Sequence, residues 1–437
     1  MPRRVATHGV GCGRPYAKNF RMAALDEPAL TAIKRAFETV PFYAGQGITG
    51  LDGTLDEVLA RLPLLTRDRV KPTLPKAWFP AGRNARAELA AGSIAVIEAG
   101  HARLRVLFDP RAWRQQEARA LALHPRAAST LASEMSPLRE AVLWVPENGT
   151  RSCGTGDPTF EERLEGSRLR LNSRQDPTFW TEPVMTRMLD EVTLHETTAL
   201  LADPFYLDVL ARHAAVLNRR LDVRGFIATT RARATLAHRR MLQRVFQGTV
   251  IDVLAAREVG TLFVEGEDGL MHHASRETHV ELLPAKVPTP GAEDVAIVVV
   301  TTLQREVQPL VRYVLGDLVQ VARGASDLAI RTAEGSIDDA IVRPDGALVT
   351  AGAIDRAVGA DVRGYQLTQR EPGALDLEVV GDVAPVARAL APLLEGMVVH
   401  ARSTTAIAVE ASGKYRATRR MHPAVSLSEA FDRCEGV

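Results

Sequence analysis

The sequence predicts an α/β protein with a large N-terminal domain and a small α+β domain at the C-terminus. Its 437 residues exceed what one ordinary hydrophobic core accommodates. Strands are expected at Gly225 to Thr230 and Val250 to Leu254, with a helix from Leu236 to Phe246 between them that Gly248 ends. This order is a βαβ unit and implies parallel strands. From Gly335 the pattern changes to short strands and helices, which indicates the second domain.

Val295 to Leu303 is the most strand-like segment of the chain. It is rich in β-branched residues and apolar on both faces, as a strand covered on both sides of a sheet would be. A charged loop is expected after it, at Pro309 to Asp317 (PLVRYVLGD), where Gly316 lets the backbone turn so that the Asp317 carboxylate faces a cleft. The simpler alternative is an ordinary Arg-Asp pair within a loop.

Other segments carry local signals for helices and strands. Thr54 to Leu62 is expected to be a helix, because Thr54 and Glu57 form a capping box and apolar residues fall on one face. A strand is expected at Ala102 to Asp109 and a helix at Pro110 to Leu123. In the small domain we expect a hairpin around Asp345-Gly346, further strands at Leu375 to Val379, Met397 to Ala401 and Thr404 to Glu410, and a helix at Val383 to Leu394.

Composition excludes several classes of protein. An apolar content of 46%, a charged content of 24% and a net charge of +1 do not indicate a protein that binds nucleic acid or a membrane surface. No stretch approaches the roughly 20 apolar residues of a membrane span. The three scattered cysteines, Cys12, Cys153 and Cys434, indicate neither a disulfide framework nor a metal knuckle, so a cytoplasmic location is expected. Met1 to Arg21 is expected to be a leader rather than a secretory signal.

The segment PLVRYVLGD resembles the P-L-(I/V)-R-Y-x-x-G-D segment of the adenylate-forming superfamily, in the branch of phenylacetate-CoA ligase and CapK-like proteins. The resemblance runs from about Phe37 to Arg420. It implies a large N-terminal domain with mixed and parallel sheets, followed by a small mobile α+β domain. The expected division is an N-terminal extension and leader at residues 1–36, the large domain at 37–334 and the small domain at 335–437.

The resemblance also implies a nucleotide site. Asp317 matches the residue that holds the ribose hydroxyls of ATP, and Arg312 is expected to bind the cofactor as well. The loop Ala255 to Gly260 stands where the family has Y-G-x-S-E-x-G. By this resemblance Glu258 is expected to be catalytic and to approach Mg²⁺, and Gly260 is expected to lie beside the nucleotide. This turn follows a strand, where open α/β sheets bind ligands. Leu254 replaces the family's aromatic residue.

Lys414 is the expected catalytic lysine. Most basic residues of the chain are arginines, so a lysine indicates a position where a compact ammonium matters. The lysines are Lys18, Lys34, Lys71, Lys76, Lys286 and Lys414. Ser412 to Arg416 resembles the family's mobile lysine loop, whose ammonium bridges the acid and the α-phosphate in the closed state. Gly335 to Asp339 resembles the family's hinge G-R-x-D-D, with Ser336 in place of the arginine. The alternative for Lys414 is a surface lysine beside a turn.

The largest departure from the family lies at Leu89 to His101, where a loop of the type S-G-T-T-G normally cradles the triphosphate. Ser93 is the remaining phosphate-binding candidate, and aliphatic residues (Ile94, Val96 and Ile97) follow it. A second Gly-rich stretch, Asn148 to Pro158, lacks the GK[ST] ending of a Walker loop and is expected to be a turn.

Two hypotheses about function follow. The first is an enzyme of secondary metabolism that uses ATP and Mg²⁺ to adenylate an aromatic or small carboxylic acid. It passes the acyl group to coenzyme A or an amine, with nitrite or a carrier protein as other acceptors. Its partners would be the small acid and, in a candidate homodimer, a second copy of the chain. The second is a degenerate relative that does not use ATP, and that acts as a binding or partner subunit or runs altered, diazotase-like chemistry in the same pocket. The lost phosphate loop, Leu254 and Ser336 motivate it.

Overall fold

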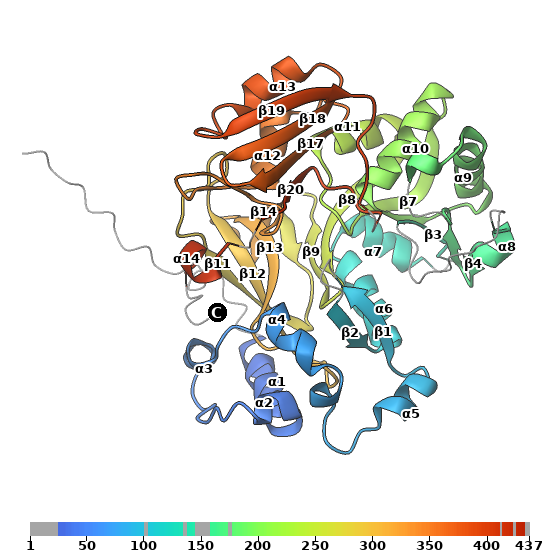
Figure 1. Cartoon of the computed structure of the whole chain (residues 1–437). Coiled ribbons are helices and arrows are strands. Elements are labelled where there is room, and N and C mark those ends of the chain that lie inside the picture. The colour runs from blue at the N-terminus through green and yellow to red at the C-terminus, as the bar shows by residue number, and fades with distance from the viewer. Residues whose placement is uncertain are drawn as a thin grey trace, which may run out of the picture.

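A computed structural model describes residues 25–99, 104–133, 138–144, 158–173, 177–410, 413–422 and 425–432. Its main feature is a sheet of twelve strands in the order β11-β12-β13-β14-β10-β9-β8-β7-β6-β3-β5-β4 (Figure 1). The predicted leader and the three cysteines lie outside the described residues, as does the Gly-rich stretch up to residue 157. The architecture is mixed α/β, as predicted, with a large sheet that is parallel from β5 to β8 and antiparallel in its other pairs.

The strands of the large sheet have the following bounds: β3 (Glu140–Leu143), β4 (Leu164–Glu165), β5 (Arg168–Arg170), β6 (Ala199–Ala202), β7 (Leu221–Thr229), β8 (Phe246–Ala256), β9 (Gly260–Glu265), β10 (Met271–His273), β11 (Thr278–Pro284), β12 (Val295–Thr302), β13 (Tyr313–Val321) and β14 (Ala329–Ser336). A separate hairpin is formed by β1 (Ala95–Ala99) and β2 (Leu104–Phe108). Its second strand confirms the strand predicted before Asp109.

The helices of the described residues are α1 (Asp26–Thr39), α2 (Pro41–Ala44), α3 (Leu55–Arg61), α4 (Arg67–Val70), α5 (Ala85–Ala90), α6 (Pro110–Leu121), α7 (Pro125–Leu131), α8 (Phe160–Arg163), α9 (Glu182–Leu194), α10 (Pro204–Val216), α11 (Leu236–Val245), α12 (Ala351–Val358), α13 (Val383–Leu390) and α14 (Leu427–Ala430), with short 3₁₀ turns η3 (Lys71–Thr73), η4 (Lys76–Trp78) and η5 (Pro177–Phe179). The capping box predicted at Thr54 and Glu57 is present at the start of α3. None of these helices has the length and apolar character that a membrane crossing requires.

Strand β8 joins the two halves of the large sheet. It pairs in parallel with β7 and in antiparallel orientation with β9, so one long strand belongs to both halves. The predicted βαβ unit is confirmed, with α11 as the crossover helix. The predicted end of the helix at Gly248 is wrong, because α11 ends at Val245 and Gly248 lies inside β8. A glycine is needed there because its φ is 132° and a Cβ would lie 3.1 Å from the Val223 carbonyl oxygen.

Strand β12 is buried on both faces, as predicted. All eight of its residues are buried. Alternate residues enter two different cores: Ala296, Val298 and Val300 pack with the N-terminal helices, and Val295, Ile297 and Val299 pack with the C-terminal segment. A strand that separates two cores has no polar face, which explains why its sequence does not alternate.

The charged loop expected at Pro309 to Asp317 is wrong in its second half. The loop ends at Arg312, and β13 begins at Tyr313 because its apolar residues pair with β12. Asp317 therefore lies within a strand, opposite Ser336 of β14. Gly316 adopts a φ of 91°, and the ladders on both sides shift register near it. The predicted turn of the backbone at this glycine is thus present as a bend in the strand.

The small C-terminal lobe is built on a four-stranded sheet in the order β19-β18-β17-β20, with bounds β17 (Tyr365–Glu371), β18 (Ala374–Val380), β19 (Val398–Thr404) and β20 (Thr418–Arg420). The predicted hairpin around Asp345-Gly346 is present as β15 (Ile341–Val342) and β16 (Leu348–Val349). The strand expected at Thr404 to Glu410 is wrong, because the Glu410 N–H donates to the Lys414 carbonyl at 2.9 Å in a local turn.

The expected domain divisions fall inside regular elements. The division at 36/37 lies within α1, which packs in the core beside β12, and the division at 334/335 lies within β14. α1 continues through the first division, whereas β14 has a register shift against β13 and a positive φ of 100° at Gly335 at the second. The domain boundaries stay predictions.

The end of the described chain returns from the small lobe to the large sheet, where α14 lies beside β11 (Figure 1). Phe431 forms a β-bridge with Ala285, and the Asp432 N–H donates to the Pro284 carbonyl at 3.0 Å. The Phe431 side chain is completely buried against the face of β12 that lines the second core. Arg420, which ends β20, and Ser426, which precedes α14, are separated by six peptide units, so the small lobe is held to the large sheet by a short connection.

We expect Phe431→Ala to lower the free energy of unfolding by about 3–5 kcal/mol, because a large buried ring would be replaced by a cavity. Scanning calorimetry would measure this as a lower melting temperature. The control is Met421→Ala, whose side chain is 61% exposed and should matter little. Equal melting temperatures for Phe431→Ala and wild type would show that this segment does not hold the fold.

Candidate active site

The predicted lysine loop docks against the first turn of α10. Tyr206 is fully buried and its hydroxyl donates to the Gly413 carbonyl at 2.8 Å. The rings of Phe205 and Tyr415 stack with centroids 4.5 Å apart and an interplanar angle of 13°. The Tyr415 hydroxyl donates to the Tyr365 carbonyl of β17, which ties the loop to the small lobe. The residues on both sides of Lys414 are thus fixed, so the ammonium is delivered to a defined place.

Lys414 is partly buried and interacts with two carboxylates of the large lobe. Its ammonium interacts electrostatically with Asp203, at the end of β6, and with Asp317 of β13. Burial lowers the pKa of Lys414, as do Arg257 and Arg416, whereas the two carboxylates act in the opposite direction. Lys414 and Asp317 thus interact electrostatically although they are far apart in the sequence, and their expected roles stay predictions.

Asp317 is held in an environment that disfavours its charge. Its pKa is raised to about 7, chiefly by burial and next by the charge of Glu258, while Lys414 acts in the opposite direction. Asp203 is similar: burial raises its pKa to about 6, opposed by the Phe205 N–H, which donates to its carboxylate at 2.9 Å, and by Lys414. These carboxyl groups would gain from a cation or from hydroxyl donors in the cleft.

A tight turn between β8 and β9 carries Glu258 into the same neighbourhood. Glu258 is 4% exposed, and its carboxylate lies 3.5 Å from the guanidinium of Arg67. Its backbone carbonyl accepts a hydrogen bond of 2.6 Å from Arg305. At Gly260 a Cβ would lie 2.3 Å from the side-chain oxygen of Gln116, so only glycine permits this close approach of α6. Gly260 thus has a packing role, and nucleotide binding by it stays a prediction.

No group of three or more metal-binding side chains is found in the part of the chain that the structure describes. Mg²⁺ in nucleotide enzymes is commonly held by one or two carboxylates together with phosphate oxygens, so Glu258 fits such a role without a cluster. The expected metal contact of Glu258 stays a prediction.

The small lobe is fixed to the large lobe by ionic contacts beside this site. The Asp355 carboxylate of α12 accepts from Arg233 at 3.1 Å and from the Leu236 N–H at 3.0 Å. Arg416, two residues after the lysine, pairs with Asp339 of the predicted hinge at 2.6 Å. The Asp355 contacts thus join the two lobes, and the Arg416 pair ties the lysine loop to the predicted hinge.

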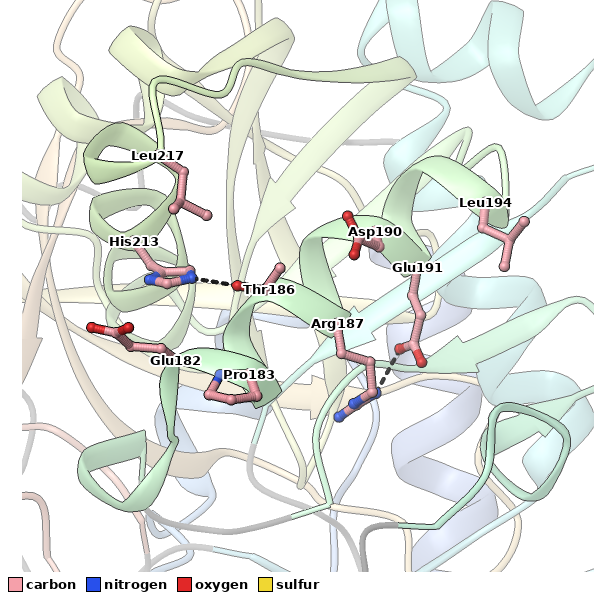
Figure 2. A pocket seen from close by; sticks show the side chains of 9 residues that line it. All are labelled: Glu182, Pro183, Thr186, Arg187, Asp190, Glu191, Leu194, His213 and Leu217. Atoms are coloured by element: carbon pink, nitrogen blue, oxygen red, sulfur yellow. Dashed lines mark hydrogen bonds and ion pairs between the residues drawn. The ribbon is translucent and has the colours of Figure 1, made fainter.

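A surface recess elsewhere contains none of these residues. It lies between α9 and α10, has a volume of about 550 Å³, and is lined by residues that include Thr186, Arg187 and His213 (Figure 2). Thr186 and His213 are hydrogen-bonded to each other across it at 2.9 Å, and Arg187 pairs with Glu191. Because these four side chains pair with one another, the recess offers few polar groups for a ligand, and the candidate site remains the neighbourhood of Lys414.

Comparison with solved structures identifies the fold. The chain superposes on 2-hydroxyisobutyryl-CoA ligase in the postadenylation state with R3-HIB-AMP with a TM-score of 0.64 and 15% identity, over 93% of this chain and 90% of that chain. The chain has the fold of this acyl-CoA ligase. The TM-score is 0.54 against an open conformation with 2-HIB-AMP and CoA (15% identity, 95% of this chain, 97% of that chain) and 0.50 against the thioesterification state (15% identity, 95% of each chain). No protein-family model matches the sequence, and no curated protein is detectably similar to it.

Within this acyl-CoA ligase fold, Arg312 makes contacts that describe a structural role. Its guanidinium forms a two-pronged ion pair with Glu281 at 2.9 and 3.0 Å and donates to the Leu59 and Leu62 carbonyls at 2.8 and 2.6 Å. Both charged side chains are less than a tenth exposed. Arg312 therefore ties the end of α3 to β11, and its expected cofactor binding stays a prediction that these contacts do not favour.

Ser93 lies in the turn before β1, where the fold's phosphate loop was expected. Its hydroxyl donates to the Glu88 carbonyl at 3.1 Å, and its N–H does the same at 3.1 Å. Both of its donors are therefore used within the turn, and phosphate binding by Ser93 stays a prediction. The neighbouring Ile94 is buried in a small core with Phe79, Leu107 and Val307 rather than beside Asp317.

Sequence reasoning missed Asp203 and the first turn of α10. A signal was present, because the apolar run that forms β6 is followed directly by Asp203-Pro204, an N-cap and a proline at the first helical position. A strand that ends in a capped helix marks the carboxyl edge of a parallel sheet, where ligands bind. Nothing in the sequence indicates that Tyr206 would contact Gly413.

We expect the Asp317→Asn variant to become more stable relative to wild type as the pH rises. In the folded protein the pKa of about 7 exceeds the ordinary value of 3.8, so wild-type Asp317 binds its proton more tightly when folded. Its contribution to stability is therefore present at low pH and is lost as the pH rises through about 7. Melting temperatures at several pH values would show a difference that grows up to about pH 7 and then levels. The control is the exposed carboxylate variant Asp361→Asn, whose difference from wild type should not change in this way.

We expect Arg312→Leu to lower the free energy of unfolding by about 3–5 kcal/mol, because it leaves Glu281 buried without its partner. The double variant with Glu281→Leu should recover most of this loss. Chemical denaturation of the two single variants and the double variant would measure both effects. A single variant as stable as wild type but weak in nucleotide binding would instead support the cofactor-binding role of Arg312.

Proposed function

We propose that the chain adenylates a carboxylic acid with ATP and transfers the acyl group to coenzyme A or an amine. The observation that carries this proposal is the docked loop that holds the Lys414 ammonium beside Asp317. The fold of 2-hydroxyisobutyryl-CoA ligase, whose solved structures contain acyl-AMP and CoA, supports it.

In this reaction a carboxylate oxygen forms a bond to the α-phosphorus, and the bond from that phosphorus to the bridging oxygen breaks, so that pyrophosphate leaves with the electron pair. Both reactants are anions, and catalysis consists largely of positioning and of neutralising charge. The ammonium of Lys414 would stabilise the charge between acid and α-phosphate. Asp317, when ionised, would accept the ribose hydroxyls, and Arg67 beside Glu258 would add positive potential. Mg²⁺, where bound, would add further charge neutralisation at Glu258.

The finer features of the proposal are the branch and the substrate. We propose the phenylacetate-CoA ligase and CapK-like branch, an aromatic or other small acid and a role in biosynthesis, on the resemblance around Asp317, Glu258 and Lys414. A cytoplasmic location and a homodimer belong to the same proposal.

A degenerate relative that does not use ATP is the second candidate. The observation that favours it is the turn at Ser93, whose donors are used internally and which is followed by the buried Ile94. The two candidates differ in whether ATP binds. ATP at a hundred times its dissociation constant should stabilise the first by about 2.7 kcal/mol and leave the second unchanged.

The activity is tested by incubating the protein with ATP, Mg²⁺ and a panel of aryl and short aliphatic acids and measuring pyrophosphate release. We expect Lys414→Ala to reduce release by about 10²- to 10³-fold, because it removes one preorganised cation. The matched control is Lys286→Ala, a lysine on the surface whose ammonium donates to the Ser428 carbonyl at 3.3 Å. Absence of release with every acid, together with absence of ATP binding by calorimetry, would exclude the adenylating enzyme.

A further inference from the structure

A second cavity, of about 280 Å³, lies beside the Glu258 turn but contains none of the residues around Lys414. It is enclosed by α6, by the turn that leads into β1 and by the loop after β12. One side is aromatic, because the rings of Phe108 and Trp113 lie 5.2 Å apart at an interplanar angle of 62° and are each only partly buried. Aliphatic side chains of Ile94, Val259 and Val307 complete the apolar wall.

Arg305 is the polar group that distinguishes this cavity. Its guanidinium lines the cavity and donates one hydrogen bond, of 2.6 Å, to the Glu258 carbonyl. No carboxylate of the described residues lies within ion-pair distance of it. Burial lowers the pKa of Arg305 to about 10, which still leaves the group cationic at neutral pH. The charge of Glu258 favours the cation, but Arg305 makes no ion pair, so its remaining donors can bind an anion in the cavity.

The other charged groups of the cavity are already satisfied. Arg83 pairs with Glu306 at 2.9 Å, and Arg119 pairs with Glu277. Asp109 caps α6, because its carboxylate accepts two backbone N–H groups of the first turn at 2.7 and 3.2 Å. Among the charged side chains that line the cavity, Arg305 is thus the arginine without an ion pair to a described carboxylate.

We propose that this cavity binds a small organic anion with an apolar or aromatic body, whose carboxylate pairs with Arg305 while its body packs on Phe108 and Trp113. Arginine suits this task because its planar fork can donate two parallel hydrogen bonds to a carboxylate. The small volume and the apolar wall exclude a nucleotide. Because the same guanidinium holds the Glu258 carbonyl, the bound acid would contact the turn that carries Glu258. The proposal does not depend on ATP use, since the site is separate from Asp317 and Lys414.

Phenylacetate is the probe, and calorimetric titration without nucleotide is the measurement. We expect wild type to bind phenylacetate and to bind the neutral phenylacetamide at least tenfold more weakly. Arg305→Gln should weaken phenylacetate binding at least tenfold, whereas Arg305→Lys, which keeps the charge, should lose less. Tryptophan fluorescence should change on binding in wild type and not in Trp113→Phe, which places the probe at the aromatic wall.

Lys414→Ala distinguishes this site from the proposed catalytic cleft. We expect it to bind phenylacetate like wild type even where it releases no pyrophosphate. Equal binding by Arg305→Gln and wild type would overturn the proposal, and so would binding that Lys414→Ala abolishes, which would place the acid in the cleft. Absence of binding by phenylacetate, benzoate and hexanoate would also overturn it. Melting temperatures of the variants would show that each is folded.

Discussion

The segment from Gly413 to Tyr415 packs against the first turn of α10, and the rest of this structure depends on that contact. It brings an ammonium from the small lobe between Asp203 and Asp317 of the large lobe. Three buried or partly buried charges in one cleft are tolerated only because they compensate one another. The pKa of Asp317 is raised to about 7 and that of Lys414 is lowered by burial, and each group favours the charged form of the other.

The two lobes are joined at more places than the predicted hinge. The Asp355 carboxylate accepts hydrogen bonds from Arg233 and from the backbone at the start of α11. The chain then returns to the large sheet, where Phe431 is buried against the second core. A rotation of the small lobe about the hinge must therefore also break buried contacts. These contacts stabilise the closed arrangement of the two lobes without a ligand.

The positive charge near Glu258 comes from arginine side chains. The turn at Ser93 uses its own donors, and Ile94 fills a small core. Arg67 reaches Glu258 from α4, and Arg305 reaches the same residue's backbone from the loop after β12. Guanidinium groups on separate elements thus contact Glu258, and they add positive potential around this turn.

The sequence by itself determined the local elements and part of the site. The apolar run of β12, the capping box of α3, the βαβ unit and the small lobe follow from periodicity and caps, because these signals depend only on neighbouring residues. The resemblance around Asp317, Glu258 and Lys414 indicated residues that the fold brings into one neighbourhood. Only the tertiary structure decided that Asp203 and Tyr206 join them, that Arg312 faces Glu281, and that Arg305 faces a cavity. These pairings join residues tens to hundreds of positions apart, and which groups meet is determined by how the sheet and lobes pack rather than by any local pattern.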